Sequence, residues 1–91
     1  MPKRVRVLIS GRVQGVFFRA FIKDNAKLLN LRGYVKNTVD GNVEALLEGK
    51  KENINKMIEL CKKGSRFSRV DNVKVKEEEC KGNYKDFGIL Y

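Results

Sequence analysis

Apolar and polar positions alternate along residues 4–10, which read RVRVLIS. Val5, Val7 and Ile9 fall on one side of this segment, and the arginines and the serine fall on the other. A period of two residues is typical of a β-strand that buries one face. The segment therefore predicts a strand near the start of the chain.

Two later segments have the three- to four-residue spacing of amphipathic helices. The first begins at Phe18 and is expected to end near Asn30, because Gly33 follows closely. The second covers residues 50–64, KKENINKMIELCKKG, and Gly64 is expected to end it. The apolar stripes predicted for the two helices are Phe18, Phe21, Ile22, Leu28 and Leu29 in the first, and Ile54, Met57, Ile58 and Cys61 in the second.

The remaining apolar segments read as strands. Residues 33–49 predict a hairpin whose two-residue turn is Asp40–Gly41. Val35, Asn37 and Val39 would share one face of its first arm. A fourth strand is expected around Val70 to Val75, and FGILY at residues 87–91 predicts a short fifth.

The order of elements is β-α-β-β-α-β followed by a short extra strand. This order is that of an α+β, ferredoxin-like sandwich, in which an antiparallel sheet carries two helices on one face. We expect residues 1–91 to form a single domain, because the chain is short and contains no internal linker. Such a fold hosts enzymes, RNA binders and regulatory domains, so function has to be argued from a site.

The segment GRVQGVFFR, residues 11–19, joins the first strand to the first helix. Gly11 and Gly15 permit backbone angles that other residues avoid, so the loop between them could turn its N–H groups inward around an anion. The free N–H groups of the following helix would point to the same place, and Arg19 could grip two phosphate oxygens. The alternative is that the glycines only shape a tight connection and Arg19 is a surface cation.

Asn37 shares the predicted buried face of the hairpin, where an amide needs hydrogen-bonding partners. It could bond locally near the turn, or it could hold a water molecule, since an amide both donates and accepts.

Together, GRVQGVFFR and the hairpin segment GYVKNTVDGNVE resemble the acylphosphatase family, and SRVD at residues 68–71 and FGILY are similar to its later segments. The resemblance covers nearly the whole chain. It implies hydrolysis of acyl phosphates to a carboxylate and inorganic phosphate, with Arg19 and Asn37 as catalytic residues. It places the phosphate on the loop residues Gln14, Gly15, Val16, Phe17 and Phe18 together with Arg19.

The chain contains no histidine, and this reaction needs none. Phosphoryl transfer passes through a loose transition state, so positioning and charge stabilisation can supply most of the catalysis. The carboxylate leaves readily without an acid. We expect no cofactor and no metal, because Asp71 and residues 77–79 read as solvated charges rather than ligands.

The formal net charge of +9 would attract small anionic substrates and polyanions alike. Two other functions therefore remain open: a small basic module that binds nucleic acid, and a phosphate-sensing module. The expected partners are an acyl phosphate and phosphate, with no membrane and no nucleic acid, and we expect a monomer. Neither a signal peptide nor a membrane span is predicted, which indicates the cytoplasm, where Cys61 and Cys80 would be free thiols.

Overall fold

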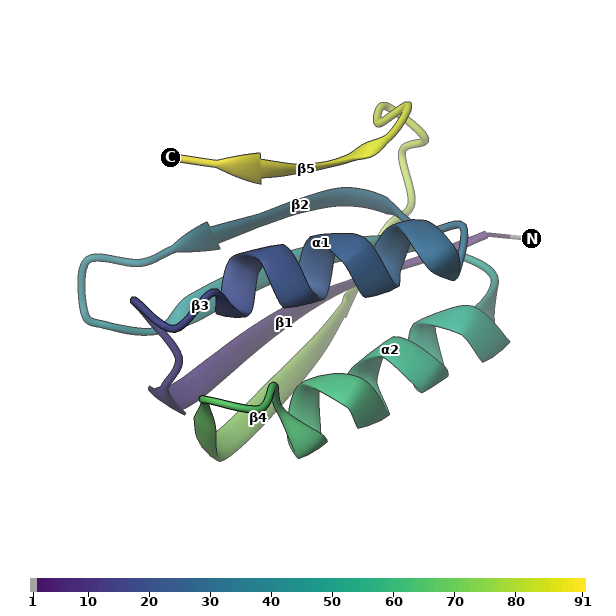
Figure 1. The fold of residues 1–91 in the computed structure, drawn as a ribbon. Helices are drawn as coiled ribbons and strands as arrows, with labels where there is room; N and C mark the ends of the chain where they lie inside the picture. Colours follow the sequence, from purple (N-terminus) through teal and green to yellow (C-terminus); the bar gives the residue numbers. More distant parts are fainter. Residues whose placement is uncertain (1) are drawn as a thin grey trace.

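The computed structural model describes residues 2–91, which form two helices and one five-stranded sheet (Figure 1). In chain order the elements are β1 (Lys3–Arg12), α1 (Phe18–Leu28), β2 (Arg32–Asn37), β3 (Val43–Gly49), α2 (Lys51–Lys63), β4 (Arg69–Glu78) and β5 (Phe87–Leu90). This is the predicted order, with the predicted short final strand.

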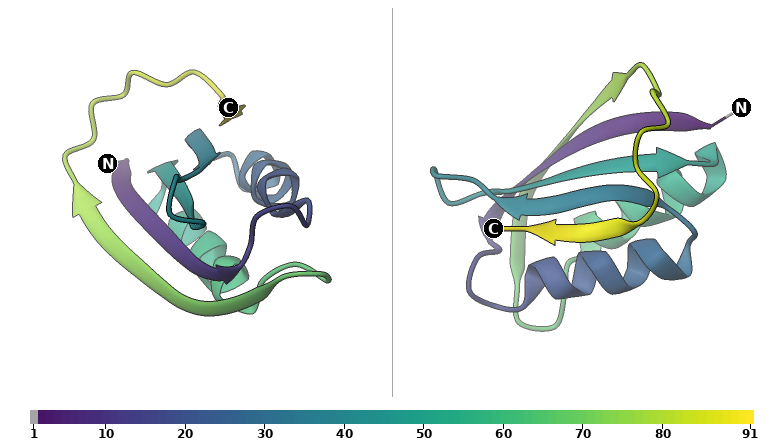
Figure 2. Two further views of the ribbon diagram at one scale, coloured as in Figure 1. Left: turned by 90° about the vertical axis from the view of Figure 1, so that its left-hand side faces the viewer. Right: turned by 90° about the horizontal axis from the view of Figure 1, so that it is seen from above.

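The strands lie in the order β4-β1-β3-β2-β5, and both helices cover the same face of the sheet (Figures 1 and 2). β1 and β3, β1 and β4, and β2 and β3 pair antiparallel, as the ferredoxin-like prediction requires. β5 is added beside β2 in the parallel direction. The sequence predicted each of the five strands but not the parallel direction of this last pairing.

The core lies between the sheet and the two helices. Val7 and Ile9 of β1 and Ile22 of α1 are completely buried, as are Met57 and Cys61 of α2. Burying a large aliphatic or aromatic side chain is worth about 1.5–3 kcal/mol, so this layer is the main source of stability. The alternating spacing in β1 and the three- to four-residue spacing in α2 therefore identified the core residues of these two elements correctly.

The predicted apolar stripe of the first helix was wrong at one position. Leu28 is exposed, and the buried residues of α1 are Phe18, Ile22 and Ala26. These three are spaced by four residues and so share one side of a helix, whereas Leu28 lies about 200° further round from Ala26. The helix ends there, and Asn30 adopts a left-handed conformation with φ of 56°.

The hairpin prediction was correct for its strands and wrong for its turn. β2 ends at Asn37, and residues 38–42 form a five-residue loop closed by a hydrogen bond from the Thr38 N–H to the Asn42 carbonyl (2.9 Å). The Asn42 N–H donates to the Thr38 hydroxyl (3.1 Å), so the loop is held by side chains as well. Because the strand has ended, its alternation stops, and Val39 is fully exposed rather than buried.

β4 contains an irregularity that explains the uneven spacing of its apolar residues. Its register against β1 shifts between Ser10 and Gly11, so that Asn72 faces Ser10 and Val70 faces Gly11. The extra residue lets both Val70 and Val73 pack against the core, although they are three positions apart and would point to opposite faces of a regular strand. No helix within residues 2–91 is long and apolar enough to cross a membrane.

Candidate functional site

The connection between β1 and α1 consists of residues 13–17 and is shorter than the sequence suggested. Gly11 was expected to open this loop, but it lies inside β1, where a Cβ would overlap the backbone carbonyl of Arg69 in β4. The residues that give the loop its shape are Gly15, with φ of 74°, and Phe17, with φ of 60°. A left-handed phenylalanine is strained by about 1–2 kcal/mol, and strain of this kind concentrates at functional sites.

The backbone N–H groups of the loop and the first helical turn are free. The first N–H of this region with an acceptor is that of Phe21, which donates to the Phe17 carbonyl (3.1 Å). Within residues 2–91, none of the six N–H groups from Gly15 to Ala20 has a hydrogen-bond acceptor. Left-handed residues on either side of Val16 turn successive N–H groups toward one side, which is the geometry of an anion-binding nest.

The start of α1 is electropositive. No acidic residue lies in its first turn, so nothing offsets the positive end of the helix dipole. Arg19 lies in that turn, and its guanidinium has no carboxylate partner among the described residues. The ring of Tyr91 lies beside the guanidinium, with its centroid 5.0 Å from the Arg19 Cζ. The guanidinium N–H groups are therefore available to an anionic ligand.

Asn37 is the last residue of β2 and reaches the same region. Its Oδ1 is buried and has no hydrogen-bond partner in the described part of the chain. A buried polar atom without a hydrogen-bond partner lowers the stability of the fold, typically by about 1–3 kcal/mol. Such an atom in a folded protein therefore needs an explanation. A ligand or a bound water molecule that donates to Oδ1 would satisfy it.

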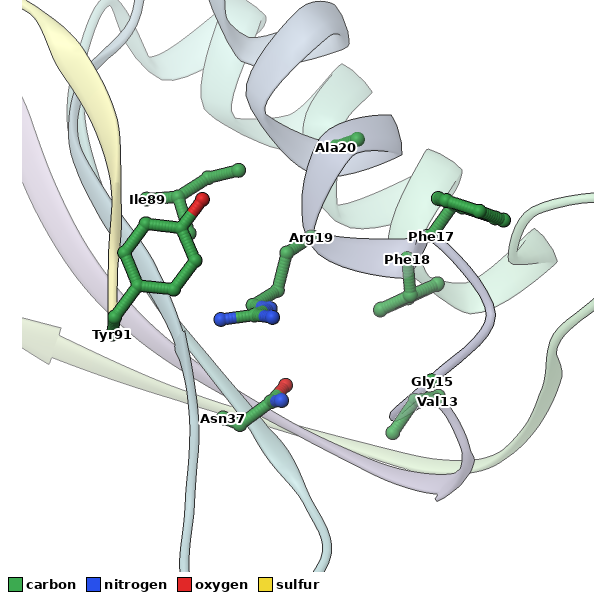
Figure 3. Close-up of a pocket in the computed structure, with 9 residues that line it drawn as sticks. All are labelled: Val13, Gly15, Phe17, Phe18, Arg19, Ala20, Asn37, Ile89 and Tyr91. Carbon is green, nitrogen blue, oxygen red and sulfur yellow. The ribbon is translucent and has the colours of Figure 1, made fainter.

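These groups meet because of the sheet topology. β1 and β2 both run antiparallel to β3, and β5 runs parallel to β2, so the carboxyl ends of β1, β2 and β5 lie at one edge (Figure 1). A pocket of about 300 Å³ lies at this edge (Figure 3). Its walls are Val13, Gly15 and Phe17 from the loop, Phe18, Arg19 and Ala20 from α1, Asn37 from β2, and Ile89 and Tyr91 from the end of the chain.

Five of the seven site residues named from the sequence line this pocket: Gly15, Phe17, Phe18, Arg19 and Asn37. The other two do not. Val16 packs against the hydrophobic core, and the side chain of Gln14 turns away to the β2–β3 loop, where its amide donates to two backbone carbonyls. Any contribution of Gln14 and Val16 to a ligand would come from their backbone.

Four residues that line the pocket were not among the predicted site residues: Val13, Ala20, Ile89 and Tyr91. Ala20 could have been found, since it follows Arg19 on the first helical turn. Ile89 and Tyr91 could not, because only the pairing of β5 beside β2 brings residues from the end of the chain to this edge.

The matching family model is Acylphosphatase, and it covers residues 5–89 of the 91. The chain belongs to the acylphosphatase family. It is 45% identical to an acylphosphatase of Syntrophobacter fumaroxidans, over 98% of this chain and 92% of that protein. It is also 51% identical to one from Methanocella arvoryzae, over 89% of this chain and 92% of that protein.

The fold of this acylphosphatase-family chain is also that of solved family members. The structure of acylphosphatase from Bacillus subtilis is similar to it with a TM-score of 0.94 and 40% sequence identity, and the match covers both chains completely. The resemblance drawn from GRVQGVFFR and the hairpin, and the ferredoxin-like fold expected from the order of elements, are therefore confirmed. Membership also identifies the chain as an enzyme, an acylphosphatase.

Proposed function

We propose that this acylphosphatase hydrolyses the carboxyl-phosphate bond of acyl phosphates without a metal and with backbone amides as its main phosphate ligands. The proposal rests chiefly on one observation: six consecutive N–H groups without acceptors lie beside an arginine without a carboxylate partner. A phosphoryl dianion satisfies both at once, since backbone donors and a guanidinium are the groups that bind phosphate oxygens most often.

The two kinds of donor have different parts in this mechanism. The backbone of residues 14–18 holds the phosphoryl group against the start of α1, where the helix dipole favours negative charge. The guanidinium of Arg19 binds two of its oxygens through a planar pair of N–H groups. Because the donors are fixed before the substrate arrives, they stabilise the charge of the transition state without reorganisation.

Asn37 is assigned to the attacking water. Its Oδ1 lacks a partner and faces the pocket that contains Arg19 (Figure 3). In the proposed mechanism this oxygen accepts a hydrogen bond from the water and directs the water's lone pair at phosphorus, in line with the departing carboxylate. The positioning of the nucleophile, rather than its ionisation, is the contribution of this side chain.

The proposed reaction needs no protein group that gives or takes a proton. A carboxylate is a weak base and departs without being protonated, and the phosphoryl oxygens can take the proton of the water late in the step. Among the described residues that line the pocket there is no Asp, Glu, Cys or His. Within residues 2–91 there is also no group of three metal-ligating side chains.

The nucleic-acid alternative finds little support in the sheet. Single-stranded RNA is usually read by aromatic rings exposed on a sheet face. Tyr34, on the face away from the helices, is buried, and its hydroxyl donates to Glu44 (2.7 Å). Arg6 on the same face is paired with Glu44 (3.0 Å) and Glu78 (2.6 Å), so its charge is already matched.

The phosphate-sensing alternative explains the loop and Arg19 but not Asn37. A protein that only binds phosphate has little use for an unpartnered amide oxygen beside the anion. The proposed enzyme uses it to hold water.

The test of the proposed function is a turnover assay on benzoyl phosphate with inorganic phosphate as an inhibitor. We expect benzoate and phosphate in equal amounts, competitive inhibition by phosphate, and activity that persists in EDTA. Phosphate binding without turnover would favour a sensor instead, and loss of activity in EDTA with recovery on added metal would refute a metal-free site.

A further inference from the structure

The connection between β4 and β5, residues 79–86, crosses the whole sheet. β4 and β5 are the two edge strands, so this connection has to pass over the three strands that lie between them. Figure 2 shows it on the face of the sheet that the helices leave open. The connection contains no helix or strand, and apart from Cys80 and Tyr84, which are partly buried, its residues are exposed. Few contacts therefore hold it to the sheet.

Tyr84 attaches this connection to the open face. The centroid of its ring lies 5.5 Å from the Cζ of Arg4 in β1, which is the distance of a cation–π contact. The same centroid lies 5.9 Å from that of the Tyr34 ring in β2, which is within the range of an aromatic pair. Arg4 and Tyr34 are both buried. One ring thus packs on two strands that are separated by β3.

Arg4 belongs to a buried ion pair that is poorly satisfied. Glu48 of β3 is completely buried beside Arg4 in the sheet, and its Oε2 lies 3.5 Å from the Arg4 Nε. Within residues 2–91, neither this Nε nor either carboxylate oxygen of Glu48 has a hydrogen-bond partner. Burying an ion pair is costly unless hydrogen bonds complete it. Water that entered when the connection lifted away would hydrate Arg4 and so offset part of the cost of opening.

β5, which follows the connection, is also held by few contacts. It pairs only with β2, and Phe87 is its one buried residue. Where the connection enters β5, the Gly33 N–H donates to the Asp86 carbonyl (3.1 Å). The Asp86 carboxylate lies 3.5 Å from the Lys27 ammonium, but both side chains are largely exposed, and such pairs contribute little to stability. As an edge strand, β5 can leave the sheet without separating any other pair of strands.

We infer that residues 79–91 form a latch that opens as one unit while the other four strands and both helices stay folded, and that the Tyr84 ring holds it closed. Segments with few buried side chains are the ones that open locally in folded proteins. The latch carries Ile89 and Tyr91 into the wall of the pocket, so its opening would remove that wall. The latch thereby links a contact on the open face of the sheet to the pocket on the opposite side of β5. Its opening does not depend on the proposed function.

The experiment is native-state hydrogen exchange of the whole protein at low urea concentrations, which measures opening segment by segment. The Gly33 N–H, whose acceptor is the Asp86 carbonyl, and the hydrogen-bonded N–H groups of β5 should share one protection factor. This factor should be at least about tenfold lower than those of β1 and β3, and it should depend weakly on urea because opening exposes little surface. Protection as high as that of β1 and β3, or the urea dependence of complete unfolding, would overturn the latch.

Three variants test the part played by the ring. Tyr84→Ala should speed exchange at Gly33 and in β5 by roughly three- to tenfold, because a cation–π contact and an aromatic pair are lost. Tyr84→Phe keeps the ring and should exchange like wild type. The matched control is Phe67→Ala: the Phe67 ring also lies 5.5 Å from an arginine Cζ, that of Arg66, but in the connection between α2 and β4. It should leave exchange at Gly33 and in β5 unchanged.

Faster exchange in Tyr84→Ala alone supports the role of the ring. Wild-type exchange in Tyr84→Ala, or the same acceleration in Phe67→Ala, would show that Tyr84 does not hold the latch closed. If Tyr84→Ala does not fold, the exchange pattern of the wild-type protein still decides whether residues 79–91 open alone, and Tyr84→Leu takes the place of the alanine variant. None of these measurements uses turnover, so a failure of the proposed function would leave them unaffected.

Discussion

The side-chain amide of Gln14 donates to the backbone carbonyl of Thr38 (2.9 Å), and the same nitrogen donates to the carbonyl of Asn42 (2.8 Å). The loop after β1 is thereby tied to the loop that follows Asn37, although 24 residues separate Gln14 from Thr38. One side chain thus links the loop of the proposed phosphate ligands to the loop beside the proposed water-binding residue.

Replacing Gln14 by methionine should loosen this connection while keeping the length of the side chain. We expect a loss of about 1–2 kcal/mol in unfolding free energy, because each of the two carbonyls loses one of its two hydrogen-bond donors. The value of kcat should fall by up to about tenfold, since Asn37 is held less firmly. Gln14→Glu should be worse, because it sets a carboxylate against two carbonyl oxygens. Urea unfolding and steady-state kinetics measure both effects, and wild-type kcat in both variants would show that the connection is only structural.

Arg19→Ala should remove nearly all turnover and sharply weaken inhibition by phosphate. Arg19→Lys should also fail, by roughly 10²-fold or more, because a single ammonium cannot bind two phosphate oxygens in one plane. Arg12→Ala is the matched control: Arg12 is exposed, does not line the pocket, and its loss lowers the net charge equally. Similar kinetics in the Arg12 and Arg19 variants would reduce the role of Arg19 to general attraction of anions.

Asn37→Ala should separate catalysis from binding. Without Oδ1 the water loses its acceptor, and we expect kcat to fall by roughly 10²-fold while the inhibition constant of phosphate changes little. The measurement is kcat on benzoyl phosphate together with phosphate inhibition in the same preparation. A loss confined to phosphate affinity would assign Asn37 to the anion instead of the water.

Gly15→Ala tests the backbone conformation of the loop. Gly15 and Gly82 have φ values of 74° and 64°, and a Cβ at either would meet no atom within 4 Å. Alanine at either position should therefore cost about 1 kcal/mol of stability through its left-handed conformation alone. Only Gly15→Ala should also weaken phosphate inhibition, because only there do the displaced N–H groups line the pocket. Equal phosphate inhibition in the two variants would count against the backbone cradle.

The thiol of Cys61 gives a prediction about pH. Burial raises its pKa to about 12, well above that of an exposed thiol. Above about pH 9 the unfolded chain therefore loses this proton while the folded chain keeps it, so alkali should lower stability through this group. Unfolding free energies from pH 8 to 10 should decline more steeply in wild type than in Cys61→Ala. Equal slopes would mean that water reaches the thiol in the folded protein.

The reaction of the two cysteines with a thiol reagent is a simpler test of whether Cys61 is buried. Cys80 is partly exposed and Cys61 is buried, and both are free. A thiol reagent at pH 8 should modify one cysteine in the native protein and both after unfolding.

Several features could be predicted from the sequence because they depend on neighbours along the chain. The alternation of Val5, Val7 and Ile9 predicted a strand, which the structure contains. Arg19 in the first turn of a helix that follows a glycine-containing loop predicts an anion site, which stays a prediction. The family resemblance added the hydrolytic chemistry and the proposed role of Asn37. Leu28 was misplaced because it lies on the opposite side of α1 from Ala26. Val39 was misplaced because β2 ends at Asn37, and the end of an element depends on tertiary contacts.

The sequence by itself determined the order of strands and helices, the glycine and arginine of the loop, and a core of alternating apolar residues, since these follow from local spacing. Tertiary structure alone decided that Gln14 reaches Thr38, that Asn37 lies near Arg19, and that Tyr91 joins them. The physical reason is that strand pairing is long-range. An alternating pattern shows which face of a strand a residue lies on, but not which strand pairs beside it. The carboxyl ends of β1, β2 and β5 come together only when that pairing is fixed.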